Sequence, residues 1–201
     1  MSFISSLTPA QVAALSTTTI AGLETQDIAA LSTAQIAQMT VAQIAVITVP
    51  NIGAFSAAQV PALTTAQVVA LTTAQVTALK TAQIAALTTT QVAAIETADI
   101  AVLPAGSVAS LTTAQTAALT TAQVVALTTA QVAALTTAQV TALTTTQVAA
   151  VETADIGALT ADQLVALTTA QVAALTTAQI VALKPTQISA LETADVAALT
   201  T

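Results

Sequence analysis

The sequence lacks the residues on which most protein chemistry depends. Among its 201 residues there is no cysteine, histidine, tryptophan or tyrosine, and the only aromatic residues are Phe3 and Phe55. Without cysteine there is no disulfide framework and no thiol nucleophile. Without histidine, the few serines have no imidazole to activate them, and zinc loses its usual nitrogen ligand. We therefore expect no catalytic residues, no cofactor-binding or metal-binding residues, no cofactor and no enzymatic activity.

Positive charge is also nearly absent. Lys80 and Lys184 are the only basic residues against nine acidic ones, and the formal net charge is −7. Phosphate backbones are bound by arrays of lysine and arginine, so nucleic acid is excluded as a partner. A small-molecule ligand is not expected either, because the sequence offers no converging set of reactive side chains.

Long hydrophobic runs are missing despite a mean hydropathy of +0.87. Threonine and glutamine interrupt the apolar residues throughout the chain. No stretch approaches the roughly 18 apolar residues of a transmembrane helix. The first six residues, MSFISS, contain no basic segment and no long apolar core, so we expect no Sec signal peptide. The compartment is left open by these features.

The chain is built from one repeat of eight residues, of which Leu127-Thr128-Thr129-Ala130-Gln131-Val132-Ala133-Ala134 is a typical copy. Positions 7, 15 and so on to 199 form twenty-five slots in a single phase, and twenty of them hold leucine. The remaining five slots hold other apolar residues: Met39, Ile47, Phe55, Ile95 and Val151. The slots at 4, 12 and so on to 196 hold valine or isoleucine except at Thr116 and Leu164.

Each octad contains the two devices that begin a helix. With Thr128 as the N-cap, Gln131 falls at the third helical position, and the pair forms a capping box. Leu127 and Val132 then occupy the two positions of a hydrophobic staple. Pro9 and Pro185 fall at the first helical position of their octads, where proline is tolerated because its missing N–H had no partner.

Two other folds compete with a chain of short helices. A single long helix would rotate the leucine and valine pattern by about 80° per octad, so no continuous apolar face would form, and we reject it. A β-solenoid is the alternative, because threonine, valine and isoleucine suit strands. The spacings of five and three residues between leucine and valine would nevertheless place them on opposite faces of a straight strand.

We therefore predict an all-α solenoid of about 25 very short helices, one in each octad. Helices of about five or six residues are unstable alone, so each must pack on its neighbours, as in other solenoids. We expect leucine, valine, isoleucine and alanine inside and threonine and glutamine on the surface. The number of octads in each turn cannot be obtained from the repeat.

The repeat predicts a single domain over residues 1–201. Residues 1–62 are less regular and could form an N-terminal cap. Within them, residues 49–55 combine proline, glycine and phenylalanine, which favours a kink. Residues 103–108 lack the capping threonine and the glutamine, and we interpret them as one weakly capped octad and not as a domain boundary.

Carboxylates are the only reactive side chains present in number. Four octads replace threonine and glutamine by an acidic pair: Glu24/Asp27, Glu96/Asp99, Glu152/Asp155 and Glu192/Asp195. Acidic residues at helix N-termini are favoured by the helix dipole, which explains them without a ligand. Calcium needs six to eight oxygen ligands, so one pair could hold at most a weakly bound surface cation. Asp162, Lys80 and Lys184 are expected to be solvated.

The octad LTTAQVAA resembles the low-complexity repeats found within very large bacterial secreted or cell-surface proteins. The resemblance covers nearly the whole chain. It implies an extended stalk or adhesive filament, exported without a Sec signal, and it carries over no functional residue.

We expect a structural protein without catalysis, either a rigid spacer or a filament subunit. End-to-end self-association is the expected partner interaction, because terminal repeats without polar caps would expose a cross-section of the core. The alternative is a binding module that uses the threonine-rich flank to hold ice, a mineral or a polysaccharide.

Overall fold

The computed structural model describes residues 3–191 and 193–199. Within these residues the chain forms 23 α-helices of four to six residues and two short 3₁₀ helices, and no strand. The predicted all-α solenoid of very short helices is confirmed, and the β-solenoid alternative is wrong. The sequence could favour strands only through the intrinsic preference of threonine and valine, which the local capping interactions override.

The chain divides into two compact units, Met1–Leu103 and Pro104–Thr201. The first unit contains η1 Phe3–Ser6, α1 Pro9–Ala13, α2 Thr17–Ala21, α3 Thr25–Ala30, α4 Thr33–Gln38, α5 Val41–Ala45, α6 Val49–Ile52, η2 Val60–Ala62, α7 Thr65–Val69, α8 Thr73–Thr77, α9 Thr81–Ala86, α10 Thr89–Ala94 and α11 Thr97–Val102. The second contains α12 Ala105–Ala109, α13 Thr113–Ala118, α14 Thr121–Val125, α15 Thr129–Ala134, α16 Thr137–Ala142, α17 Thr145–Ala150, α18 Thr153–Ile156, α19 Ala161–Val165, α20 Thr169–Ala173, α21 Thr177–Ala182, α22 Pro185–Ile188 and α23 Thr193–Ala198. A single domain over residues 1–201 stays a prediction.

Helices begin as the capping box predicts. At α7, the Thr64 hydroxyl accepts the N–H of Gln67 at 3.2 Å, and the Gln67 side-chain oxygen accepts the N–H of Thr64 at 2.7 Å. The cap residue is extended, with a ψ of 159°. Pro9 and Pro185 each stand at the first residue of a helix, as expected.

Helices end without a residue of positive φ. Glycine is the C-cap of only three of them, at Gly22, Gly53 and Gly157, and each is right-handed. At the end of α15, Leu135 takes an extended conformation with a ψ of 139°, and its N–H donates to the carbonyl of Val132 at 3.2 Å. The next residue, Thr136, is the extended cap of α16. In octads that end this way, two extended residues make the bend. In others, such as α7 with Ala70, the C-cap is right-handed, and no described residue has a positive φ. This explains how an array of turns can contain only four glycines.

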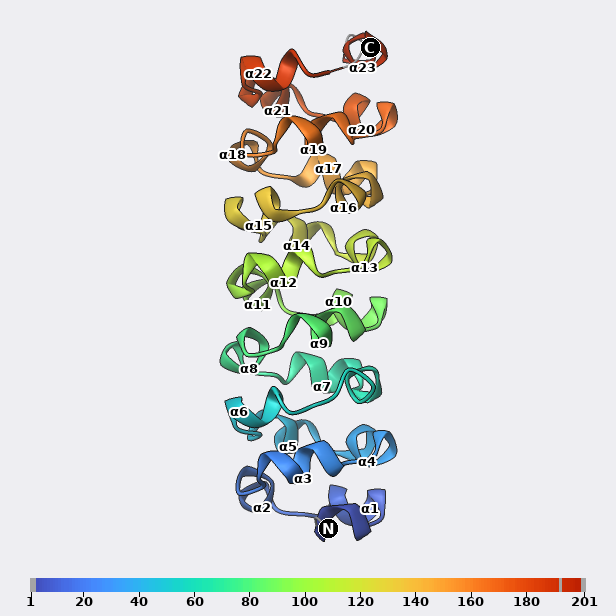
Figure 1. The fold of residues 1–201 in the computed structure, drawn as a ribbon, viewed down its shortest axis with the longest axis vertical. Coiled ribbons are helices and arrows are strands. Elements are labelled where there is room, and N and C mark those ends of the chain that lie inside the picture. Colours follow the sequence, from blue (N-terminus) through green and yellow to red (C-terminus); the bar gives the residue numbers. More distant parts are fainter. Residues whose placement is uncertain (1–2, 192, 200–201) are drawn as a thin grey trace. The chain divides into compact units, whose positions relative to one another are not determined.

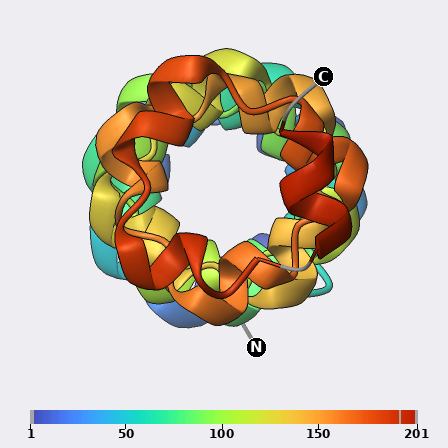
Figure 2. The ribbon, with the colours of Figure 1, turned by 90° about the horizontal axis from the view of Figure 1, so that it is seen from above.

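Each unit is a coil in which every helix packs on the third helix along the chain. Helix α1 contacts α4 and α7 contacts α10 in the first unit, while α13 contacts α16 in the second. Figure 1 shows α4 above α1, and α10 above α7. The view from above shows the last coil of the second unit as short helices that follow one another around a ring (Figure 2).

Three octads show how a single substitution changes the local structure. Pro61 lacks an N–H, and its octad forms only the short 3₁₀ helix η2. Pro104 caps α12 without a side-chain hydrogen bond, which confirms the weak cap. The division between the two compact units falls between Leu103 and Pro104, at the octad that we did not interpret as a boundary. Thr116 occupies a fully buried valine slot, where its hydroxyl donates to the carbonyl of Thr112 at 3.0 Å.

The core is aliphatic. Leucine-slot and valine-slot residues fill the inside of each coil; Ile44, Ile84 and Leu164, for example, are completely buried. The threonines at the cap and at the first helical position are exposed, as expected. The glutamines at the third helical position are buried, except for Gln11. Their burial is the main difference from the sequence-based expectation.

Candidate functional site

The glutamine at the third helical position is the most constrained polar residue of the repeat. The side chain of Gln67 is 1% exposed. Its oxygen completes the capping box of its own helix, and its amide nitrogen donates to the carbonyls of Ile36 at 2.8 Å and Met39 at 2.6 Å. Those carbonyls lie 31 and 28 residues earlier in the chain. One buried amide therefore links two successive coils.

This link satisfies the backbone groups that helix ends leave unpaired. A helix cannot satisfy its own last carbonyls. The Ile36 carbonyl accepts the N–H of Met39 at 3.1 Å and also the amide of Gln67, so both of its lone pairs are used. The Met39 carbonyl at the bend receives the second Gln67 hydrogen. An unpaired buried acceptor would cost about 1–3 kcal/mol.

The same arrangement recurs through each unit, and we call it the glutamine ladder. Its members with donation to carbonyls 28 and 31 residues earlier are Gln35, Gln43, Gln59, Gln67, Gln75, Gln83 and Gln91 in the first unit, and Gln139, Gln147, Gln163, Gln171, Gln179 and Gln187 in the second. The spacing means that the chain returns to the same angular position after between three and four octads.

The expectation of glutamine on the surface is therefore wrong. The capping box accounts for only the oxygen of the amide, and the partner of its nitrogen lies in another coil. A signal was nevertheless present in the sequence. A capping box accepts glutamate as well as glutamine, and the helix dipole would favour glutamate. The chain has seventeen glutamines and four aspartates in this slot and no glutamate. A side chain of the length of glutamine is therefore found there only when it can donate.

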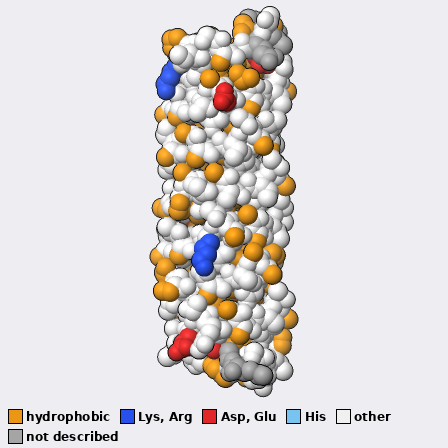
Figure 3. All heavy atoms as spheres, viewed as in Figure 1, with side chains coloured by type: hydrophobic (Ala, Val, Ile, Leu, Met, Phe, Trp, Pro, Cys, Tyr) orange, Lys and Arg blue, Asp and Glu red, His pale blue; other side chains and the backbone are white. Residues whose placement is uncertain are grey.

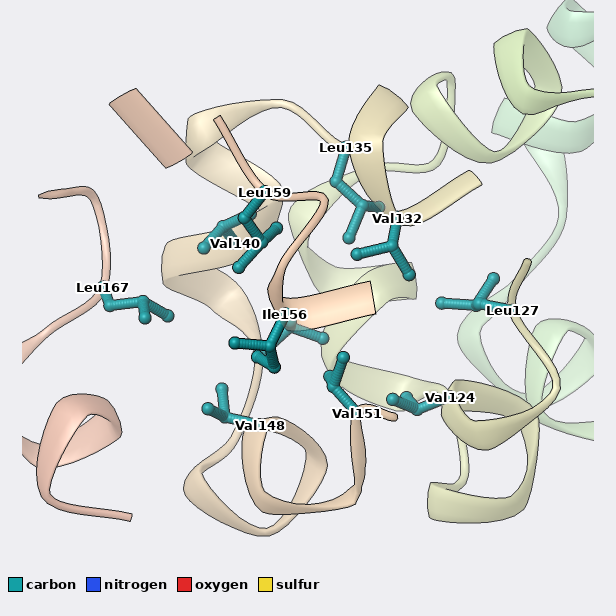
Figure 4. Close-up of a pocket in the computed structure, with 11 residues that line it drawn as sticks. Val124, Leu127, Val132, Leu135, Val140, Val148, Val151, Ile156, Leu159 and Leu167 are labelled. Atoms are coloured by element: carbon teal, nitrogen blue, oxygen red, sulfur yellow. The ribbon is translucent and has the colours of Figure 1, made fainter. Parts of the chain in front are cut away.

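In the second unit, the space between the core side chains is too small for a ligand. An enclosed cavity of about 20 Å³ is lined by eleven valine, leucine and isoleucine side chains. Figure 4 shows these side chains, Ile156 and Val140 among them, converging from successive octads. A water-sized space without polar partners stays dry. The cavity is a packing defect between aliphatic side chains.

The acidic pairs are divided between the surface and the ladder. Glu24, Glu96 and Glu152 are exposed N-caps, whereas Asp99 and Asp155 are buried in the ladder slot, with 4% and 3% exposure. Asp27 is half-buried and accepts the N–H of Glu24 at 3.1 Å. Asp195 is buried, and Glu192 lies outside the described residues.

Other charged residues lie apart from one another on the surface. Asp162, Lys80 and Lys184 are exposed, as expected. The backbone N–H of each lysine donates to the glutamine of its own octad at 2.7 Å. The described residues contain no group of three or more acidic residues that could hold a metal ion by side chains alone. The face in Figure 3 accordingly shows few charged side chains among mostly polar and backbone atoms.

The helices are all too short to cross a bilayer: within the part of the chain that the structure describes, no candidate membrane span is found. This agrees with the sequence-based expectation. Neither comparison with curated proteins nor comparison with solved structures gives a match.

A family model does match, and it matches the repeat itself. The ALTTAQ repeat model fits six segments, at residues 20–57, 51–81, 69–94, 92–129, 125–151 and 148–185. The threonine, alanine and glutamine of that motif are the N-cap, the second helical residue and the ladder amide described above. Because the matched segments together span residues 20–185, this chain belongs to the ALTTAQ repeat family.

Proposed function

We propose that this repeat protein is a rigid structural spacer without catalytic activity. The observation that supports the proposal most is the glutamine ladder, because buried hydrogen bonds tie each coil to the one before it. A segment built this way resists bending, since any tilt of one coil on the next breaks buried bonds. The absence of histidine and cysteine from the sequence, and the lack of a grouped set of acids among the described residues, support the absence of catalysis.

Rigidity within one unit can be measured directly. The chain contains no cysteine, so cysteines introduced at the exposed positions Thr33 and Thr89 are the only sites that a spin label will modify. We expect double electron–electron resonance to give one narrow distance distribution for this pair in the first unit. The exposed pair Thr121 and Thr177 tests the second unit in the same way.

A broad distribution in either unit of the wild-type background would contradict the spacer. The same label pair in a Gln67→Glu background is the matched control and should broaden in the first unit only. Self-association into a filament would instead add a second peak to the distance distribution. The amplitude of that peak would rise with protein concentration and fall when unlabelled chain is mixed in.

A binding flank is the second candidate, favoured by the threonines at the first helical position. Thr65 and Thr89 lie on the contacting helices α7 and α10, and Thr113 and Thr137 lie on α13 and α16. All four are exposed, and no described residue accepts or donates a hydrogen bond at their hydroxyls. Within each unit, these hydroxyls repeat from one coil to the next and are available to an outside surface.

If this flank binds ice or a polysaccharide, replacing the four threonines by valine should remove thermal hysteresis or polysaccharide retention. The caps are untouched, so circular dichroism should show unchanged helix content. Thr77→Val is the matched control, because Thr77 is exposed but its hydroxyl is already bonded to the carbonyl of Thr73 at 2.8 Å. If the fourfold variant and the wild type show equal polysaccharide retention and equal thermal hysteresis, the threonine flank is not a binding surface for either.

A further inference from the structure

Aspartates interrupt the glutamine ladder at Asp99, Asp155 and Asp195, all three of them buried. The cap of the Asp195 octad, Glu192, lies outside the described residues, so Asp99 and Asp155 are the two whose octads are fully described. Asp99 in α11 and Asp155 in α18 occupy the slot that glutamine otherwise fills, and both are more than nine-tenths buried. Neither carboxylate has a hydrogen-bond partner among the described residues, and the capping box found in most octads is missing from both helices. With no protein donor, each carboxylate depends on solvent or on a bound ion to offset the cost of its burial.

Each aspartate also removes a donor from the preceding coil. In the regular octads the leucine-slot carbonyl 28 residues earlier accepts the glutamine amide at 2.5–2.9 Å. The corresponding carbonyls here are those of Leu71 and Leu127, and no described residue donates to either. The coils concerned are in contact, through α8 with α11 and through α15 with α18. The register of the coils therefore pairs the Asp99 carboxylate with the Leu71 carbonyl, and the Asp155 carboxylate with the Leu127 carbonyl. Both members of each pair are hydrogen-bond acceptors.

The size of the space suits a cation. An aspartate side chain is one carbon–carbon bond shorter than glutamine, about 1.5 Å. A nitrogen–oxygen contact near 2.7 Å, as in Gln75 and Ile47, thus becomes an oxygen–oxygen separation of roughly 4 Å. Hard cations bind oxygen at about 2.3–2.6 Å, so one ion between the two oxygens would contact both. No fully enclosed side-chain oxygen lacks a partner within the described residues, which means that solvent reaches these carboxylates.

The acidic side chains near Asp99 and Asp155 also favour a bound cation. Glu96 and Glu152, three residues before each aspartate, add a second carboxylate at the exposed cap. The chain as a whole carries a net charge of −7. Near the second site, Lys184 lines a surface recess together with Thr153 and Gly157, so its ammonium competes there with a bound cation. Lys80 lies beside Gly53, where its Cε is 3.7 Å from the position that a Cβ on that glycine would take.

We propose that Asp99 and Asp155 each bind a calcium-class divalent cation, held between the aspartate carboxylate and the carbonyls of the preceding coil. In the first unit these are the Leu71 carbonyl and the free lone pair of the Val68 carbonyl, and Leu127 and Val124 correspond to them in the second. The ion replaces the two glutamine hydrogens as the link between coils. Because water must complete the six to eight ligands of calcium, the dissociation constant is expected near the weak end, about 10⁻⁴–10⁻³ M.

The test uses the full chain and calcium alone. Millimolar calcium chloride should raise the melting temperature by several degrees beyond sodium chloride of equal ionic strength. Calorimetric titration should find at least two sites per chain. Asp99→Gln with Asp155→Gln restores the ladder donor at both places. This double variant should melt higher than the wild type without calcium and should lose the part of the calcium response that Asp99 and Asp155 supply.

Two controls keep the result specific. Asp162→Asn removes an exposed acid of the second unit and should leave the calcium response intact. Asp99→Gln and Asp155→Gln made singly should each remove one of the two sites. A calcium effect no larger than that of sodium chloride would overturn the proposal, and so would a full calcium response in the double glutamine variant. Neither result depends on whether the protein is a spacer.

Discussion

Replacing Gln67 by glutamate should destabilise the first unit by about 3–5 kcal/mol, the usual cost of an uncompensated buried charge. The substitution keeps the shape of the side chain and the oxygen that completes the capping box. It removes both hydrogens donated to Ile36 and Met39 and sets a carboxylate against two carbonyl oxygens. Thermal or urea unfolding at neutral pH measures the loss. The loss should shrink as the pH falls, because the neutral acid can donate one hydrogen bond.

Gln11 provides the matched control. It lies in the first coil of its unit, where its side chain is exposed and makes only the capping box with Thr8. Gln11→Glu should change the free energy of unfolding by no more than about 0.5 kcal/mol. Equal destabilisation by the two substitutions would show that the helix cap, and not the link between coils, is what glutamine supplies.

Replacing Ile44 by alanine should cost about 2–5 kcal/mol, the range for deleting most of a fully buried aliphatic side chain. Ile44 in α5 is completely buried. Its carbonyl accepts the amide of Gln75 at 2.9 Å, and that backbone contact survives the substitution. The effect thus measures core packing separately from the ladder.

Hydrogen exchange identifies which helices of the Ile44→Ala variant lose stability. Because coils contact only their neighbours, amides of α5 and of α7, which packs on α5, should lose protection first. Val69→Ala is the control, since Val69 is 45% exposed and should cost less than about 0.5 kcal/mol. Uniform loss of protection across the whole first unit would indicate all-or-none unfolding and would contradict a nearest-neighbour coil.

Much of the local structure follows from eight consecutive residues. The threonine hydroxyl, the glutamine oxygen and the staple of leucine with valine all act within one octad, so the start of each helix was predicted correctly. Proline positions and the weakly capped octad at residues 103–108 were predicted for the same reason. These interactions join residues only three to five positions apart, and their geometry is contained in the repeat.

The hydrogen-bond partners of each glutamine nitrogen could not be predicted from a single octad. It binds carbonyls 28 and 31 residues earlier, and that separation depends on how many octads complete one turn. The number of octads per turn depends on the angle at each leucine–threonine bend and on how valine and leucine side chains pack between coils. Neither quantity appears in a repeat that is the same at every copy.

The same limit explains the aspartates. At the level of one helix, Asp99 and Asp155 look like acids placed favourably at an N-terminus, and Asp27 is such a residue, half-buried and bonded to its own cap. Only the stacking of coils buries the other two and sets them against carbonyls that lack a donor. Short-range hydrogen bonds decided where helices begin and end, and close packing between distant segments decided which polar side chains lie inside, because burial is a property of the assembled coil.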